Sequence, residues 1–391
     1  TTAGHLTIRP EEDLSVVPET GDNWGFAPDR DNPTYRRRGF SGLLVKKGTS
    51  VQNLGPNVAF TDFTKHSITV DGGHVNAGGI IAQHAHVGVN VINGGDCRLQ
   101  SATISTNGKA NILTENASNC IVEKSIILSS GVNKCYDSSN LKIHDSAILY
   151  NCDDYGSNKH VLDVAKSSSL DLERTLNKRC GNINGNAVVL HQHANARFYY
   201  CSLEDCGGGG IYTNSSNCTV YYSNIGPLNG VAAFSLFNSQ MDFGNVILSG
   251  VGALGDNAGG DGFVAAHAGH MQLTRACVNY NQYNGYSYLS YSDGSMDSTT
   301  GANMWLWGRY AQSGSAGGDH GGAVGCNSGA FLDIDIMNFG LNDGTPFIGC
   351  LAGQTIPSSS NSLRGGGIDG IGRVRITKEW TSGRPSDWQA V

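Results

Sequence analysis

The chain has 391 residues, and its formal net charge of −7 comes from 33 acidic and 26 basic side chains. So few Lys and Arg residues argue against a nucleic-acid groove. No apolar run is long enough to cross a membrane. We therefore expect neither a nucleic acid nor a membrane as a partner.

Residues 1–59 lack the repeat that fills the centre of the chain. They contain Trp24 and a charged run that ends in Arg36-Arg37-Arg38. The three arginines suit either a site for an anionic ligand or a solvated turn, and we favour the turn. Because a repeat array needs a cap over its first repeat, we predict that residues 1–59 form an N-terminal cap or attachment segment.

One sequence motif, which we call the phrase, recurs through residues 60–335. Its clearest copies, residues 119–127 and 140–148, read Asn, two residues, an apolar anchor, two polar residues, a small residue, any residue and an apolar residue. The anchors of the eight copies are Leu99, Val122, Ile143, Leu172, Phe198, Val220, Phe243 and Leu273. Subtracting successive anchor numbers gives intervals of 21 to 30 residues, a spacing that is typical of a solenoid.

The phrase also predicts the secondary structure. Apolar or small residues alternate with polar ones, which suits short strands that bury one face. Gly, Asn and Ser interrupt every apolar run, so no helix of useful length fits. We predict an all-β chain that forms a right-handed parallel β-helix, with two or three strands and tight corners in each coil. Ile127 and Ile148 should then be buried and stacked on each other.

The chain contains 11 cysteines, an odd number that does not suit a secreted disulfide framework. Cys97, Cys120 and Cys218 stand beside anchors, and Cys201 takes the small position of its phrase, where a thiol acts as a small hydrophobe. We expect mostly reduced thiols and folding in a bacterial cytoplasm. No Cys-x-x-Cys pair or Cys–His spacing suggests zinc, and neither a metal nor a cofactor is expected.

The later coils resemble β-helical segments of bacteriophage tail fibres and tailspikes, which are pectate-lyase-like solenoids. The resemblance lies in a second motif, Gly-aromatic-x-Ala/Tyr, which is followed by Gly-Ser-x, then Asn, then Gly-Tyr. Its parts are Gly262-Phe-Val-Ala-Ala-His267, Gly285-Tyr-Ser-Tyr-Leu-Ser290, Asp293-Gly-Ser295-Met296 and the coil at residues 322–331. It covers about residues 260–335, and the general coil pattern covers about residues 65–335.

This resemblance implies a virion protein of the phage tail that is assembled in the host bacterial cytoplasm. Such a protein forms a homotrimer, contacts other virion tail proteins, and recognises and in some cases depolymerises a bacterial surface polysaccharide. In the family, segments like residues 336–391 cap the helix or join three chains, and we assign them that role.

Two other functions stay open at this point. One is a secreted, free-standing polysaccharide lyase or glycoside hydrolase, and the other is a non-catalytic structural fibre or adhesin stalk. β-Helices host all of these functions, so the fold does not choose between them.

Residues one and two positions after each anchor should point outwards and form ladders from coil to coil. A charged ladder would consist of Lys124, Asp145 and Arg174. An aromatic ladder would consist of Tyr199, Tyr200, Tyr221 and Tyr222. With coils about 4.8 Å apart, the tyrosines could form a platform for sugar faces, and packing between coils or against another chain explains them equally well.

Longer anchor intervals place extra residues after the second strand of consecutive coils. The first such stretch carries Asp153 and Asp154, the second carries Lys178 and Arg179, and the next coil follows with Glu204 and Asp205. Paired carboxylates about 5 to 9.5 Å apart carry out glycoside hydrolysis, whereas cations beside carboxylates suit a lyase. Surface ion pairs are the non-catalytic alternative. The four carboxylates are our candidate catalytic residues, and Lys178, Arg179 and the four tyrosines are our candidate substrate contacts.

Overall fold

The computed structural model describes residues 6–8, 41–128, 132–149, 160–178, 186–204, 209–226, 228 and 233–249, together with the strands of the C-terminal part. These residues form a right-handed parallel β-solenoid, which confirms the predicted fold class. None of the described segments is a helix, and the described residues therefore contain no helix long and apolar enough to cross a membrane.

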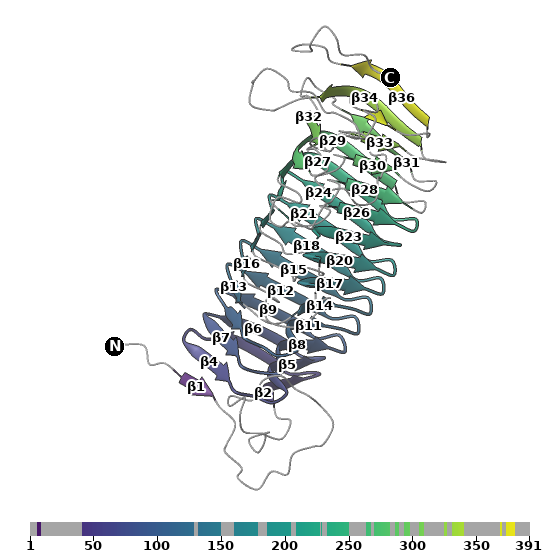
Figure 1. Ribbon diagram of the computed structural model, residues 1–391. Helices are drawn as coiled ribbons and strands as arrows, with labels where there is room; N and C mark the ends of the chain where they lie inside the picture. Colours follow the sequence, from purple (N-terminus) through teal and green to yellow (C-terminus); the bar gives the residue numbers. More distant parts are fainter. Residues whose placement is uncertain are drawn as a thin grey trace, which may run out of the picture. The chain divides into compact units, whose positions relative to one another are not determined.

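The chain divides into two compact units. Unit 1 comprises residues 1–188 with 194–196, and unit 2 comprises residues 189–193 with 197–391. Within each unit, equivalent strands of successive coils lie side by side and pair in parallel (Figure 1).

A coil of unit 1 has three strands, as in β11 (Ala110–Thr114), β12 (Asn119–Glu123) and β13 (Ile126–Leu128). We call β11 and its equivalents in other coils first strands, β12 and its equivalents long strands, and β13 and its equivalents short strands. The first strands form one sheet, and the long and short strands together form the other. The other first strands are β2 (Ser41–Lys46), β5 (His66–Asp71), β8 (Val87–Ile92), β14 (Val132–Cys135) and β17 (Leu162–Ala165). The other long strands are β3 (Ser50–Leu54), β6 (His74–Gly78), β9 (Asp96–Gln100), β15 (Asn140–His144) and β18 (Ser169–Glu173). The other short strands are β4 (Val58–Thr61), β7 (Ile80–Gln83), β10 (Thr103–Ser105), β16 (Ala147–Leu149) and β19 (Leu176–Lys178), and β1 (Leu6–Ile8) pairs with β4.

Unit 2 has the same parallel pairing. β20 (Val188–His191) and β21 (Asn195–Tyr199) contain the boundary between the units. The other strands of unit 2 are β22 (Ser202–Glu204), β23 (Ile211–Asn214), β24 (Asn217–Tyr221), β25 (Asn224–Ile225), β26 (Ala233–Leu236), β27 (Gln240–Ser249), β28 (Phe263–Ala266), β29 (His270–Asn281), β30 (Tyr286–Tyr288), β31 (Asp293–Asp297), β32 (Trp305–Gly308), β33 (Val324–Cys326), β34 (Phe331–Phe339), β35 (Ile368–Asp369) and β36 (Arg373–Glu379).

Parallel pairing occurs as early as β1, which pairs with β4, and as late as β36, which pairs with β34. The proposed domain boundaries at residues 59 and 335 stay predictions.

The anchors form the inner wall of the long strands. Leu99, Val122, Ile143 and Leu172 are register partners in successive coils of unit 1, and all four are fully buried. In unit 2, Val220, Phe243 and Leu273 are partners in the same way. The short strands add a second column, in which Ile104, Ile127 and Ile148 stack in register and are fully buried, as predicted. Fully burying one such side chain contributes about 1.5–3 kcal/mol, so the repeated column holds the coils together.

The corner between each long strand and its short strand is made by one residue, two positions after the anchor. We call it the corner residue, and it has left-handed backbone angles, with φ of 50° at Lys124, 50° at Asp145 and 46° at Arg174. Its amide donates to the next coil, as Lys124 N does to His144 O at 3.0 Å. One left-handed residue turns the chain sharply enough to start a new strand.

In coils that have Ser at the small position of the phrase, its hydroxyl completes the corner. Ser125 Oγ accepts a hydrogen bond from Ala102 N at 2.9 Å and donates one to Glu123 O at 2.7 Å. Ser146 Oγ repeats this arrangement one coil further, accepting from Ser125 N at 3.1 Å. The small position therefore satisfies backbone groups that the corner would otherwise leave buried and unpaired.

Five cysteines behave as small hydrophobes. Cys97, Cys120, Cys135, Cys201 and Cys218 are buried free thiols. Cys97 and Cys120 stack in register beside the anchor column. Burial raises the pKa of the Cys135 thiol to about 12, so it stays protonated and inert. The expectation of reduced thiols is confirmed for these five.

Candidate aromatic site on unit 2

Six of the ten predicted site residues lie in the described part of the chain. They are Lys178, Tyr199, Tyr200, Glu204, Tyr221 and Tyr222. The other four, Asp153, Asp154, Arg179 and Asp205, lie outside the described residues. The predicted catalytic pairs are therefore not tested, whereas the predicted tyrosines can be placed.

Three of the tyrosines form a contact group, which we call the tyrosine cluster: Tyr199, Tyr200 and Tyr222. The rings of Tyr200 and Tyr222 are stacked, with centroids 5.1 Å apart and planes inclined by 22°. The Tyr199 ring meets both edge-on, at 4.6 Å from Tyr200 and 5.5 Å from Tyr222. These separations lie in the favourable range for aromatic pairs, so three of the four tyrosines of the predicted aromatic ladder are in contact.

The solenoid corner explains why these rings meet. Tyr200 and Tyr222 are corner residues of successive coils, with left-handed φ values of 54° and 50°. The Tyr200 amide donates to Tyr221 O at 3.2 Å, and the Tyr222 amide donates to Gly244 O at 2.9 Å. Two corners one coil apart therefore hold the two rings at the coil spacing.

The cluster is open to solvent although its rings are large and apolar. Tyr200 is 52% exposed and Tyr222 is 46% exposed. Left-handed angles are uncommon for a bulky residue and cost energy. Lys124, Asp145 and Arg174 share the left-handed angles, so what distinguishes these two corners is the pair of exposed, stacked aromatic rings.

Tyr221 belongs to the same surface but stands apart from the ring contacts of the cluster. It is 38% exposed and lies at the end of β24. Its register partner in β27 is Gly244. A Cβ atom on Gly244 would lie 2.2 Å from Tyr221 Cε1 and 2.3 Å from Tyr221 Cδ1, so an edge of the ring occupies the space of a side chain at residue 244.

The remaining predicted residues stand at strand ends. Glu204 ends β22, and its Oε1 accepts a hydrogen bond from Ser202 Oγ at 2.7 Å. Lys178 ends β19 in unit 1 and is the register partner of Leu149, which ends β16.

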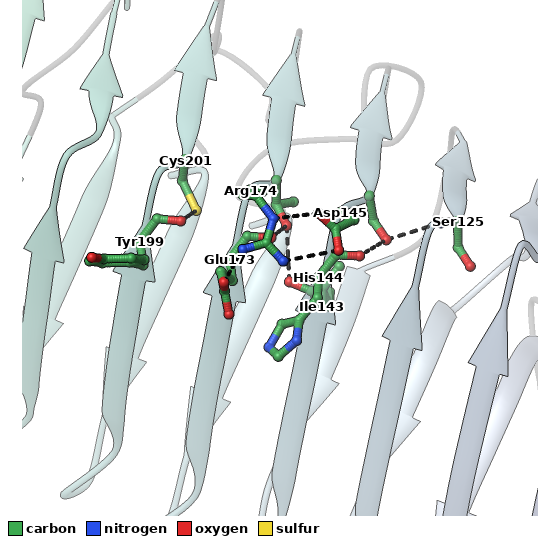
Figure 2. Close-up of polar contacts among 10 residues, drawn as sticks. Ser125, Ile143, His144, Asp145, Glu173, Arg174, Tyr199 and Cys201 are labelled. Carbon is green, nitrogen blue, oxygen red and sulfur yellow. Dashed lines mark hydrogen bonds and ion pairs between the residues drawn. The ribbon is translucent and has the colours of Figure 1, made fainter.

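Two members of the predicted charged ladder, Asp145 and Arg174, form an ion pair on unit 1 (Figure 2). Arg174 Nε donates to Asp145 Oδ1 at 2.5 Å, and Arg174 Nη2 donates to Asp145 Oδ2 at 3.1 Å. Arg174 also pairs with Glu173, its neighbour in the chain. The hydrogen bonds from Arg174 hold the pKa of the Asp145 carboxyl below its usual value. Because these side chains are exposed, the pairs contribute little to stability, and we assign them no chemistry.

Sequence reasoning missed the left-handed corners and the close approach of the Tyr221 ring to Gly244. The signal for Gly244 is present in the sequence, because other copies of the phrase have a side chain directly after the anchor, as at Glu123, His144 and Glu173. Among the described residues, no group of three or more His, Cys, Asp and Glu side chains is arranged to hold a metal ion.

Comparison with known proteins adds no relative. No protein-family model, no curated protein and no solved structure matches the chain. The likeness to phage tail proteins is thus a resemblance of sequence phrases, and the β-solenoid is what the structure establishes.

Proposed function

We propose that the protein recognises a bacterial surface polysaccharide, in the manner of a phage tail fibre or tailspike. The observation that carries the proposal is the tyrosine cluster, in which corner rings one coil apart are held in contact and left exposed. The parallel β-solenoid is compatible with this function.

The chemistry of the cluster suits a saccharide. A tyrosine offers an apolar ring and a phenol hydroxyl that both donates and accepts hydrogen bonds. A sugar ring offers C–H groups beside hydroxyls, so it can contact ring and phenol together. Because the solenoid backbone fixes both corners, little side-chain freedom is lost on binding, which favours affinity.

Alanine variants of the two corner tyrosines test the proposal. Binding would be measured on an array of purified bacterial O-antigens and capsular polysaccharides. We expect the intact chain to bind a polysaccharide, and Tyr200→Ala and Tyr222→Ala to weaken that binding about tenfold or more, the scale of an interface hot spot. The matched control is Lys124→Ala, which changes a corner residue of unit 1. Binding that is unchanged in both tyrosine variants would refute the proposal.

Cleavage of the polysaccharide is the second candidate activity. Glu204 favours it, because this carboxylate is held by Ser202 at the end of β22, directly before Asp205. We expect Asp153→Asn, Asp154→Asn or Glu204→Gln to abolish product formation while binding is kept. Ultraviolet absorbance from an unsaturated uronic acid would identify a lyase, and a new reducing end without that absorbance would identify a hydrolase. Product formation at the normal rate in all three variants would exclude these carboxylates from catalysis.

A further inference from the structure

Gly244 breaks a pattern that the long strands β9, β12, β15 and β18 keep. The residue directly after the anchor, which we call the flank position, is filled by Gln100, Glu123, His144 and Glu173 in unit 1, and these are register partners from coil to coil. In unit 2 the flank position is Tyr199, Tyr221 and then Gly244. A side chain is thus missing from the coil that follows Tyr221.

The Tyr221 ring uses the space that this missing side chain leaves. Its Cδ1–Cε1 edge lies where a Cβ atom of residue 244 would be, at 2.3 and 2.2 Å, whereas Cζ is 3.6 Å away. Real Cβ atoms are essentially never found so close to another atom, so any side chain at residue 244 would displace the ring. Gly244 is buried, while Tyr221 keeps 38% of its surface exposed.

We propose that Gly244 is a specificity-determining position that lets Tyr221 serve as a second aromatic subsite, one coil beyond the tyrosine cluster. This inference rests on the proposed polysaccharide-binding function. Tyr200, Tyr222 and the Tyr221 ring over Gly244 then span three coils, a distance of about 10 Å from the strand spacing. That length exceeds a single sugar ring, so the ligand is an oligosaccharide segment that lies along successive coils.

Gly78 provides a matched control for Gly244. It occupies the flank position of β6, directly after the buried residue Ala77, and its register partner in the next coil is Gln100. A Cβ atom on Gly78 would meet only Gln100 O, at the ordinary distance of 3.7 Å. Gly78→Ala therefore makes the same chemical change at the same place in a coil without displacing a ring.

The experiment is a double-mutant cycle of Gly244→Ala and Tyr221→Ala. The probes are the array polysaccharide that the intact chain binds, together with its fragments of one to six sugar units. We expect each single variant to lower affinity for the polysaccharide about tenfold, and the double variant to lose no more than Tyr221→Ala alone. We also expect the intact chain to prefer fragments of two or more units over the single sugar, and both single variants to reduce this preference. Gly78→Ala should bind normally.

Several outcomes would overturn the inference. One is full binding by Gly244→Ala while Tyr200→Ala and Tyr222→Ala lose it, a result that leaves the proposed function standing. A second is equal and additive losses in the cycle, because Gly244 would then act independently of Tyr221. If Gly244→Ala does not fold, Tyr221→Ala alone decides, since normal affinity and length preference in that variant would remove the second subsite. If every tyrosine variant binds the polysaccharide with unchanged affinity, the proposed function itself is refuted.

Discussion

Two buried asparagines in unit 1 differ in whether their side-chain amides form hydrogen bonds. Asn107 is fully buried; its Oδ1 accepts from Ala85 N at 3.0 Å, and its Nδ2 donates to Ala82 O at 3.3 Å and to Asn111 Oδ1 at 3.0 Å. Asn177 is 1% exposed, and neither atom of its amide has a hydrogen-bond partner among the described residues. Asn177 is the register partner of Ile148, so it stands in the column of stacked isoleucines.

Leucine substitutions should separate these two residues. Asn177→Leu has a similar size and removes a buried, unpaired amide, so we expect the free energy of unfolding to rise by about 1 kcal/mol or more. Asn107→Leu leaves the buried Ala85 amide without its acceptor, and we expect a loss of about 1–3 kcal/mol. Thermal and denaturant unfolding of both variants would measure the difference. A destabilised Asn177→Leu protein would show that the Asn177 amide is satisfied in solution, for example by buried water.

The residue scale also shows where sequence reasoning stops. The phrase predicts that Ile127 and Ile148 stack, because strand alternation and the anchor period together fix which face is buried. The copy that begins at Ser169 places Asn177 where the others have an apolar residue. The sequence reveals that departure, but whether the amide finds a partner depends on atoms from neighbouring coils.

At the scale of one coil, the corner residue has an unfavourable backbone conformation. Lys124, Asp145, Arg174, Tyr200 and Tyr222 all have left-handed φ values. A non-glycine residue in that conformation costs about 1–2 kcal/mol, and Asn and Asp tolerate it better than other residues. The chain therefore accepts strain at corners where a Lys, an Arg or a Tyr is placed.

Relief of this strain is testable at an exposed corner without a proposed role. We expect Lys124→Asn to raise the free energy of unfolding by about 0.5–1 kcal/mol, because Asn adopts left-handed angles at lower cost. Lys142→Asn is the control, since the same change is made in the extended β15, where Asn is unfavourable. Chemical denaturation would compare them. A gain in both variants, or in neither, would argue against corner strain as the cause.

Corners and anchors differ in how far the sequence predicts them. The anchor needs only an apolar residue at a fixed interval, so eight copies suffice to predict its register. The sequence shows Ser125 only as a small residue of the phrase. The two backbone partners of its hydroxyl are known only from the folded corner. For the candidate site, the phrase brought Tyr200 and Tyr222 together, whereas the direction of the Tyr221 ring depends on the adjacent Gly244. Asp153 and Asp154 fall on an insertion that carries no repeat and hence no register, whereas Glu204 is the last residue of β22.

The outer face of the short strands in unit 1 bears on the assembly of the whole molecule. Ile126 points away from buried Ile127 and is 44% exposed. Its register partner is Ala147, which pairs in turn with Leu176, and Leu128 and Leu149 form a half-buried column beside them. The outer face of the long strands is more polar, with Arg98, Ile121, Lys142 and Asp171 in register. An apolar face of this kind suits contact with another protein chain.

The last prediction is the homotrimer that the resemblance to tailspikes implies. We expect light scattering of the purified chain to give three times the chain mass of 41.2 kDa. If the short-strand face lies between chains, Ile126→Lys should shift the mass towards the monomer, because a charge would be buried without a partner. Ile121→Lys is the control, since it adds the same charge to the polar face of the long strands. A trimer that is unaffected by Ile126→Lys would move the interface to another part of the chain. A monomer of the intact protein at micromolar concentration would favour the free-standing polysaccharide enzyme over the tailspike, because a single chain would then have to form the whole binding surface.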